Sequence, residues 1–378
     1  MNLETHNPVP SVFLLVANLA TGGDAAPVRL LAPLLLRNNI RVTIGVVGTA
    51  SESDLDEVRA AYITVRRFPI RHFFDVKGVR RLRQALREID PTVVHAWGPA
   101  AASVARHIVS GNWDGTNTPR LVVSGASITG GGIGGWLIAR QIRRADRVIP
   151  TTRVDGERYR KFGVSSERLT LIGPATSTVK GEPNRDELCK SFGIPSSSQF
   201  LIGGGRSYRG IGPKDAIVAF DMLRYDNPQL HLIVFGSGPE TVALEQFGRA
   251  LAFDDFRIRF ATSPSERAGA VQMASAVLIT QSRGGVEVAL EAMAIGKPVV
   301  GWNTPELMEI VDDGVTGFLV PVGDRVALAS KARKLLEEPD LAVQMGEAGK
   351  ARIVGRFSIS RMFDQYKRLY MELAGGNP

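Results

Sequence analysis

Short apolar runs alternate with longer stretches of helical periodicity in the first half of the chain. Residues 12–17 (VFLLVA) and 41–47 (RVTIGVV) are typical of strands, and residues 24–37 between them are typical of a helix. The rhythm continues through strand-like runs at 92–97, 120–125 and 147–152. Because crossover helices fit between these runs, the pattern predicts a parallel sheet.

A second alternation follows a stretch rich in Gly, Pro, Ser and Thr, in which we place an interdomain linker at 176–184. The pattern therefore predicts two doubly wound α/β domains, at 1–175 and 185–357. The expected strands of the second domain are 200–204, 231–236, 257–260, 276–280 and 297–302, and the three closing helices are expected at 324–338, 340–355 and 358–374.

Length and composition agree with this division. A chain of 378 residues suits two domains. The single cysteine, Cys189, excludes a disulfide framework and a multi-cysteine zinc site, and it fits a reducing compartment such as the cytoplasm. The start of the chain lacks a basic region before its apolar run, and no apolar run reaches the ~20 residues of a membrane span. We expect membrane contact only at the periphery.

Positive charge is concentrated in the first half. Residues 1–175 hold 23 Lys and Arg against 14 Asp and Glu, whereas the remainder holds 23 against 24. The asymmetry favours an anionic partner for the first half. The region from Arg66 to Arg87 combines a basic amphipathic segment with Phe73 and Phe74, so it fits an anionic membrane surface, with a solvated charged face as the alternative. No nucleic-acid partner is expected.

Glycine-rich turns after strands are the main candidates for ligand binding, since bare amides and helix N-termini attract phosphate. One turn, with Gly22 and Gly23, follows the first strand, and two more follow strands of the second domain. The expected phosphate-binding residues of the first of those two turns are Gly204, Gly205, Arg206, Arg209 and Lys214, and the second, with Gly236, Gly238 and Pro239, would complete a nucleotide site.

Three further features leave alternatives open. Gly130, Gly132 and Gly135 formally match a dinucleotide-binding fingerprint, which would make the protein an NAD-dependent oxidoreductase, but a loop at the mouth of a cleft is the preferred interpretation. His95 is either a core histidine or a functional one. Glu291, four residues after Glu287, is either held by the hydroxyl pair of a ligand or solvated.

The motifs together resemble those of retaining family 4 glycosyltransferases with the GT-B fold. The most specific pair is LEAMAIGKPVV at 290–300 and EIVDDGVTGFLVP at 309–321. The other matching segments are GG at 22–23, VVHAW at 93–97, ADRVI at 145–149, GGGR at 203–206, FGSGPE at 235–240 and FSISRMFDQYKRLY at 357–370.

The resemblance implies two Rossmann-like domains that face each other across a cleft, with the final helix, 358–378, packed back on the first. A nucleoside-diphosphate sugar of UDP or GDP type would bind the second domain, and a glycan or lipid-linked acceptor would bind the first, near His95 and Gly131. Neither metal nor cofactor would be needed. Arg206 matches the phosphate-binding arginine of the family, and Glu291 matches its ribose-binding glutamate; Gly236, Gly238 and Pro239 would contact the ribose and base.

The sequence departs from the family where the donor sugar would lie. The first glutamate of the E-x7-E motif is replaced by Arg283, beside Gly284, Gly285 and Val286, and the expected lysine by Ile211. Arg283 would recognise a carboxylate on an acidic donor sugar, or else it would pair with Glu287 in a catalytically impaired relative. An active transferase is the preferred hypothesis. Its catalytic residues, nucleotide base, sugar, acceptor and oligomeric state stay open.

Overall fold

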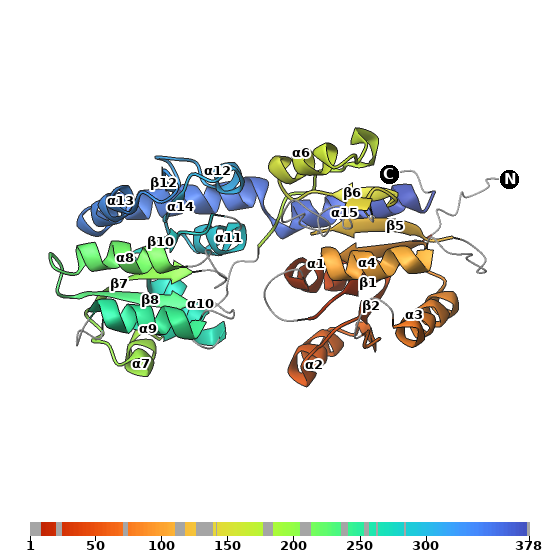
Figure 1. The fold of residues 1–378 in the computed structure, drawn as a ribbon, viewed down its shortest axis with the longest axis horizontal. Coiled ribbons are helices and arrows are strands. Elements are labelled where there is room, and N and C mark those ends of the chain that lie inside the picture. The colour runs from red at the N-terminus through yellow and green to blue at the C-terminus, as the bar shows by residue number, and fades with distance from the viewer. Residues whose placement is uncertain are drawn as a thin grey trace. The chain divides into compact units, whose positions relative to one another are not determined.

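The structure of the chain is a computed structural model, shown in Figure 1. It describes residues 9–375 apart from 20–24, 71–74, 110–117, 126–138, 141, 177–183, 205–212, 236–240, 253–256, 262–263 and 283–284. The chain divides into two compact units, Met1–Pro174 with Ile359–Pro378, and Ala175–Ser358.

The first unit is built on a parallel sheet of six strands in the order β3-β2-β1-β4-β5-β6. Its strands are β1 (Ser11–Val16), β2 (Arg41–Val46), β3 (Thr64–Arg67), β4 (Val93–Trp97), β5 (Arg120–Ser124) and β6 (Arg147–Ile149). Its described helices are α1 (Ala26–Arg37), α2 (Glu52–Ala60), α3 (Val76–Ile89), α4 (Gly98–Val109), α6 (Arg153–Lys161), a 3-10 turn (Ser166–Arg168) and α15 (Ile359–Leu373).

Alternate residues of each strand point to opposite faces of this sheet. Phe13 and Leu15 of β1 share a core cluster with Leu82 of α3 and Ala105 of α4. The C-terminal helix α15 packs against α1 and buries Tyr366 and Tyr370. Figure 1 shows this blue helix among the first unit's elements, so the two ends of the chain contribute to one core.

The second unit repeats the architecture with the strand order β12-β11-β10-β7-β8-β9. Its strands are β7 (Gln199–Gly204), β8 (Leu230–Phe235), β9 (Ile258–Ala261), β10 (Ala276–Ile279), β11 (Val299–Trp302) and β12 (Gly317–Val320). Its helices are α7 (Arg185–Phe192), α8 (Lys214–Leu223), α9 (Thr241–Ala252), α10 (Pro264–Met273), α11 (Val286–Ala294), α12 (Pro305–Ile310), α13 (Arg325–Glu337) and α14 (Pro339–Arg356).

The two faces of the second sheet have separate apolar cores. Phe200 of β7 and Ile233 of β8 belong to the cluster that includes α7, α10 and α11. Leu201 and Leu232, one position along each strand, belong to the cluster that includes α8 and α13. Because helices cover both faces of this sheet, its backbone is accessible to a ligand at the edges and strand ends.

The predicted fold class is confirmed, with differences at element ends. The strand expected at 147–152 ends at Ile149, because Thr152 caps α6 by accepting a hydrogen bond from the backbone N–H of Asp155 at 3.1 Å. Two strands, β3 and β12, are absent from the predicted set. Each has four residues, and β3 has no buried residue, so its hydrophobic pattern is weak.

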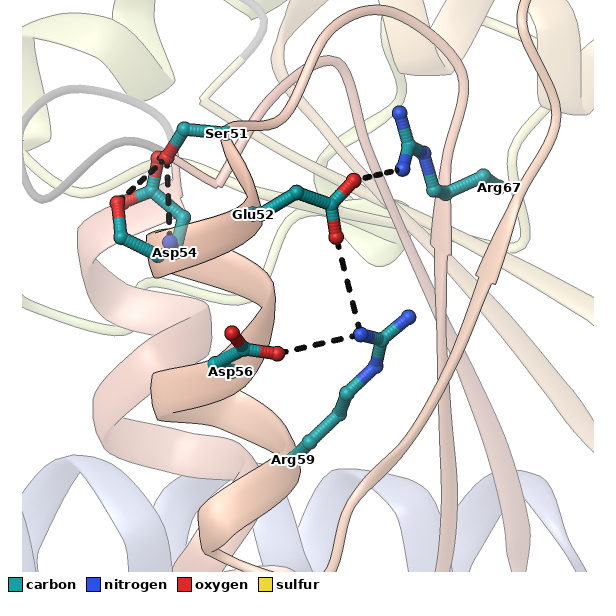
Figure 2. Close-up of polar contacts among 7 residues, drawn as sticks. Ser51, Glu52, Asp54, Asp56, Arg59 and Arg67 are labelled. Carbon is teal, nitrogen blue, oxygen red and sulfur yellow. Dashed lines mark hydrogen bonds and ion pairs between the residues drawn. The ribbon is translucent and has the colours of Figure 1, made fainter.

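Helix α2 shows how polar residues fix an element of the first unit. The hydroxyl of Ser51 accepts from the backbone N–H of Asp54 at 3.1 Å and caps the helix. Figure 2 shows Glu52, in the first turn, between two guanidinium groups, 2.6 Å from Nη1 of Arg67 and 3.9 Å from Nη1 of Arg59. The pair with Arg67 links α2 to the edge strand β3, and the pair with Arg59 lies within α2.

Candidate functional site

Two strand ends of the second unit meet without space for an added side chain. Gly204 ends β7, and Phe235 ends the neighbouring strand β8. A Cβ atom on Gly204 would lie 2.5 Å from Cζ of Phe235 and 3.2 Å from Cγ1 of Val288 in α11. Glycine is therefore required here by close packing, and the ring of Phe235 lies between β7 and the nearby helices.

Glu291 lies beside this contact and forms an ion pair. Its two carboxylate oxygens both accept from Nη2 of Arg267 in α10. The guanidinium carbon of Arg267 also lies 5.3 Å from the centre of the Phe235 ring. The sequence-based alternatives for Glu291, a ligand hydroxyl pair or solvent, did not include this partner, because α10 is 24 residues away in the sequence.

Arg267 and Phe235 are the members of this group that sequence reasoning missed. The sequence signal for Phe235 was available, since it precedes the glycine turn at 236–240. No motif marks Arg267, because its role depends on the packing of α10 against the same sheet face as α11. The structure therefore brings together Gly204, Glu291, Arg267 and Phe235 at one strand-end site.

Gly285 and Val286 open α11 at the neighbouring strand end. Gly285 has a φ of +80° at the N-cap, and a Cβ there would approach Cγ2 of Ile279 to 2.5 Å. Both constraints favour glycine. The Oε1 atom of Gln281 would lie 3.3 Å from that Cβ, so the Gln281 side chain is next to the start of α11.

Buried polar side chains follow β10 and β11. Thr280 and Gln281 come directly after β10, and each is 4 % exposed. Thr304 caps α12 after β11, and Glu306 in the first turn of that helix is 7 % exposed. The carboxylate-bearing side chain of Glu306 is therefore inside the protein, close to the end of β11.

Lys214 begins α8, on the other face of the sheet. Its Nζ lies 4.5 Å from the centre of the Phe247 ring in α9, and that ring packs on the apolar cluster of α8 and α13. Glu291 and Phe235 belong to elements on the opposite face. The structure thus places Lys214 and Glu291 at carboxyl ends of the same sheet without bringing their side chains together.

The remaining predicted ligand residues lie outside the described residues. They are Gly22, Gly23, Gly131, Gly205, Arg206, Arg209, Gly236, Gly238, Pro239, Arg283 and Gly284, and the fingerprint at Gly130, Gly132 and Gly135 lies outside them as well.

His95 has a structural place in the first unit. It is completely buried in β4. Its Nδ1 lies 2.6 Å from the hydroxyl of Tyr370 in α15, and its Nε2 lies 2.7 Å from the hydroxyl of Ser124 in β5. With no exposed surface and two hydrogen-bonded nitrogens, His95 lies in the core of the first unit, and its expected contact with an acceptor stays a prediction.

Burial controls the ionisation of His95, Tyr366 and Tyr370. Desolvation lowers the pKa of His95 to about 3, so the imidazole is neutral at physiological pH. Desolvation likewise raises the pKa of Tyr366 and of Tyr370, so both phenols stay protonated. The neutral cluster joins β4 and β5 to the C-terminal helix.

Within the described part of the chain, no group of three or more His, Cys, Asp or Glu side chains is arranged to hold a metal ion. None of the described helices combines the length and the apolar character needed to cross a membrane.

Comparison with known proteins identifies the family. The model of glycosyltransferase family 4 matches residues 21–179, and that of glycosyl transferases group 1 matches residues 184–352. N-acetyl-alpha-D-glucosaminyl L-malate synthase of Bacillus anthracis is 28 % identical over 188 residues, which are 50 % of this chain and 49 % of that protein. The capsular polysaccharide biosynthesis glycosyltransferase CapM of Staphylococcus aureus is 25 % identical over 209 residues, 54 % and 55 % of the two chains. The chain thus matches about half the length of these curated relatives.

Solved structures share the fold. Anabaena Alr3699/HepE in complex with UDP and glucose has a TM-score of 0.82 at 18 % identity, covering 95 % of this chain and 99 % of that one. Sucrose-phosphate synthase of Thermosynechococcus elongatus has a TM-score of 0.76 at 19 % identity, covering 97 % and 99 %. With two family models that together span nearly the whole chain and two parallel six-stranded sheets, the chain belongs to the family 4 (group 1) glycosyltransferases of the GT-B fold.

Proposed function

We propose that this chain is an enzyme that transfers a sugar, with retention of configuration, from a nucleoside-diphosphate sugar to a glycan or lipid-linked acceptor. The second unit, Ala175–Ser358, would bind the donor, and the first unit would bind the acceptor. The observation that carries the proposal is the position of Glu291. This partly exposed carboxylate lies beside the ends of β7 and β8, and it matches the ribose-binding glutamate of the family.

The site has the chemistry that a nucleotide needs. A carboxylate accepts hydrogen bonds from both hydroxyls of a ribose. Parallel sheets of this type bind ligands outside the carboxyl ends of their strands, where Gly204, Gly285 and Glu291 lie. A neighbour of the same fold is solved with UDP and glucose, which supports a UDP-type donor.

Charge stabilisation of the departing diphosphate would come from the protein. Arg206, Arg209 and Lys214 follow the glycine turn at Gly204 and Gly205 in the sequence, and guanidinium and ammonium groups stabilise developing phosphate charge. We therefore propose that the reaction needs neither a metal ion nor a cofactor. Activity that persists in EDTA would support this, whereas activity restored only by a divalent ion would contradict it.

Nucleotide binding and turnover test the proposal directly. The wild-type protein is titrated with UDP, GDP and ADP in a calorimeter, together with Glu291→Ala and the control Glu337→Ala, which removes an exposed carboxylate from α13. Loss of charged hydrogen bonds to ribose is expected to weaken binding by about 1.5 to 3 kcal/mol, or more than tenfold, only in Glu291→Ala.

Slow hydrolysis of a UDP- or GDP-sugar then separates an active transferase from a catalytically impaired relative. Hydrolysis by the wild type supports activity. Nucleotide binding without any turnover, with or without acceptor, would favour the impaired relative. Equal affinities of Glu291→Ala and the wild type would overturn the ribose role.

A second proposal concerns an anionic membrane surface, at the cytoplasmic side. Arg66 and Arg67 of β3 are paired, with Glu88 at 3.1 Å and Glu52 at 2.6 Å. The exposed face of α3 instead carries an excess of cations, and its exposed basic residues are Lys77, Arg80, Arg81 and Arg87. Anionic lipid attracts each such charge by about 1 kcal/mol.

Vesicle binding tests this contact. Replacing both Arg80 and Arg81 with Gln is expected to lower partitioning onto vesicles that contain phosphatidylglycerol by about tenfold or more, with no change on neutral phosphatidylcholine. The double variant Arg333→Gln and Lys334→Gln, on the exposed face of α13, is the charge-matched control. Equal losses in both double variants would contradict a specific role for α3.

A further inference from the structure

The Arg267–Glu291 pair has a geometry that bears on nucleotide binding. One nitrogen of Arg267, Nη2, donates to both oxygens of the Glu291 carboxylate. A donor shared in this way lies between the two oxygens. The two hydroxyls of a ribose would bind the same pair of oxygens, since each hydroxyl donates one hydrogen bond.

A second contact holds the guanidinium in that place. The ring of Phe235 lies 5.3 Å from the guanidinium carbon of Arg267, within the range of a cation–π interaction. Phe235 is 4 % exposed, and its ring is packed against Gly204. Arg267 is therefore held by a carboxylate and by an aromatic ring that is itself fixed.

The pair is nevertheless open to solvent. The side chains of Arg267 and Glu291 are 36 % and 33 % exposed. Ion pairs with this much exposure are weak, because water screens them and long side chains lose freedom when they are held. A ligand that supplies two hydroxyl donors is thus able to displace the guanidinium.

We propose that Arg267 competes with the ribose hydroxyls for Glu291 and has to move aside when a nucleotide binds. This inference rests on the proposed function, in which Glu291 is the ribose-binding residue. The competition makes the site selective. A ribonucleotide offers two hydroxyls to replace the guanidinium, whereas a 2′-deoxyribonucleotide offers only one and leaves Arg267 the stronger competitor.

Titrations with UDP and 2′-deoxy-UDP test the competition. Arg267→Met removes the charge and the donors but keeps an unbranched apolar side chain beside Phe235. It is expected to bind UDP about two- to fivefold more tightly than the wild type, which is the range of an exposed ion pair. Arg333→Met in α13, which breaks the exposed pair of Arg333 with Asp226, is the matched control and should leave UDP affinity unchanged.

A variant that lacks the charge of Glu291 shows whether the gain in UDP affinity depends on this carboxylate. In a Glu291→Gln background, Arg267→Met is expected to give no increase in UDP affinity, because the competition no longer exists. Arg267→Gln provides a second variant of the same position, and thermal unfolding confirms that each variant is folded.

The outcomes distinguish this inference from the proposed function. Weaker or unchanged UDP binding by folded Arg267→Met and Arg267→Gln, with binding by the wild type intact, would overturn the competition; weaker binding would make Arg267 a nucleotide contact. A gain that persists in Glu291→Gln would also overturn it. Failure of the wild type to bind UDP, GDP or ADP would overturn the proposed function, and the competition with it.

Discussion

His95 and Glu291 are polar residues to which the same family resemblance assigns ligand contacts, yet the structure treats them differently. His95 is completely buried, and both of its ring nitrogens have hydrogen-bond partners within 2.7 Å. The Glu291 side chain is 33 % exposed, and its ion-pair partner, Arg267, is itself exposed to solvent. The polar side chain is therefore part of the core in the first unit and accessible to solvent in the second.

The difference shows that the degree of burial, more than the residue type, decides whether a polar side chain stabilises the fold or is accessible to a ligand. A buried hydrogen-bonded group contributes to folding because its loss leaves partners unsatisfied. A partly exposed ion pair contributes little to the free energy of folding, so a ligand can replace one of its partners at small cost. The predictions below test this contrast, from the largest expected effect to the smallest.

Truncation of His95 should have the largest effect on stability. His95→Ala leaves a cavity and removes the partners of Tyr370 and Ser124, so the free energy of unfolding is expected to fall by about 3 kcal/mol. Urea unfolding measures the change. Glu291→Ala, in the same assay, should lower stability by less than about 1 kcal/mol. Equal losses in the two variants would remove the proposed contrast.

Lowering the pH should destabilise the folded protein through His95. Burial lowers the pKa of His95 to about 3, whereas an unfolded histidine has a pKa of about 6.5. Between these values the unfolded chain binds a proton that the folded protein does not, so stability rises with pH and is lost as the pH falls below 6.5. The contribution is a loss of about 2 kcal/mol from pH 7 to pH 5.

The pH dependence of urea unfolding checks this contribution. His95→Ala should show a flatter dependence between pH 7 and pH 5 than the wild type, since the group that takes up the proton is gone. Parallel curves for the two proteins would mean that His95 titrates normally in the folded state.

Two tightly packed glycines provide a matched pair, one in each unit. A Cβ on Gly45 would lie 2.4 Å from Cζ of Phe13, and one on Gly204 would lie 2.5 Å from Cζ of Phe235. Gly45→Ala and Gly204→Ala should each lower stability by at least about 1 kcal/mol, because a buried ring has to shift. Only Gly204→Ala should also change UDP affinity, because Phe235 contacts Arg267. Calorimetric titration of both variants with UDP measures the two affinities. An equal change in UDP affinity would contradict a specific role for the contact between Gly204 and Phe235.

Much of the fold could be predicted because its signals are local. The alternation of apolar runs and helical periods indicated two parallel sheets, and ten of the twelve strands in the described part of the chain overlap predicted runs. The edge strands β3, with residues TVRR, and β12, with GFLV, were not predicted. Strand β3 has no buried residue, so its hydrophobic pattern is weak.

The candidate site was predictable only in part. Gly204, Gly285 and Glu291 carry motif signals; Gly204 ends β7, and Gly285 caps α11, the helix that holds Glu291. The partner of Glu291 was not predictable, because Arg267 lies in another helix and in no motif. The environment of His95 was equally hidden, since Tyr370 is 275 residues away in the sequence.

The amino-acid sequence by itself determined the α/β class of the two halves, the glycine turns and the motifs that identify the family, because each depends on residues close together in the chain. Only the tertiary structure decided that His95 is a buried link to the C-terminal helix and that Glu291 is held by Arg267 beside Phe235. Both outcomes depend on which distant side chains meet and on how much water reaches them, and local sequence patterns encode neither.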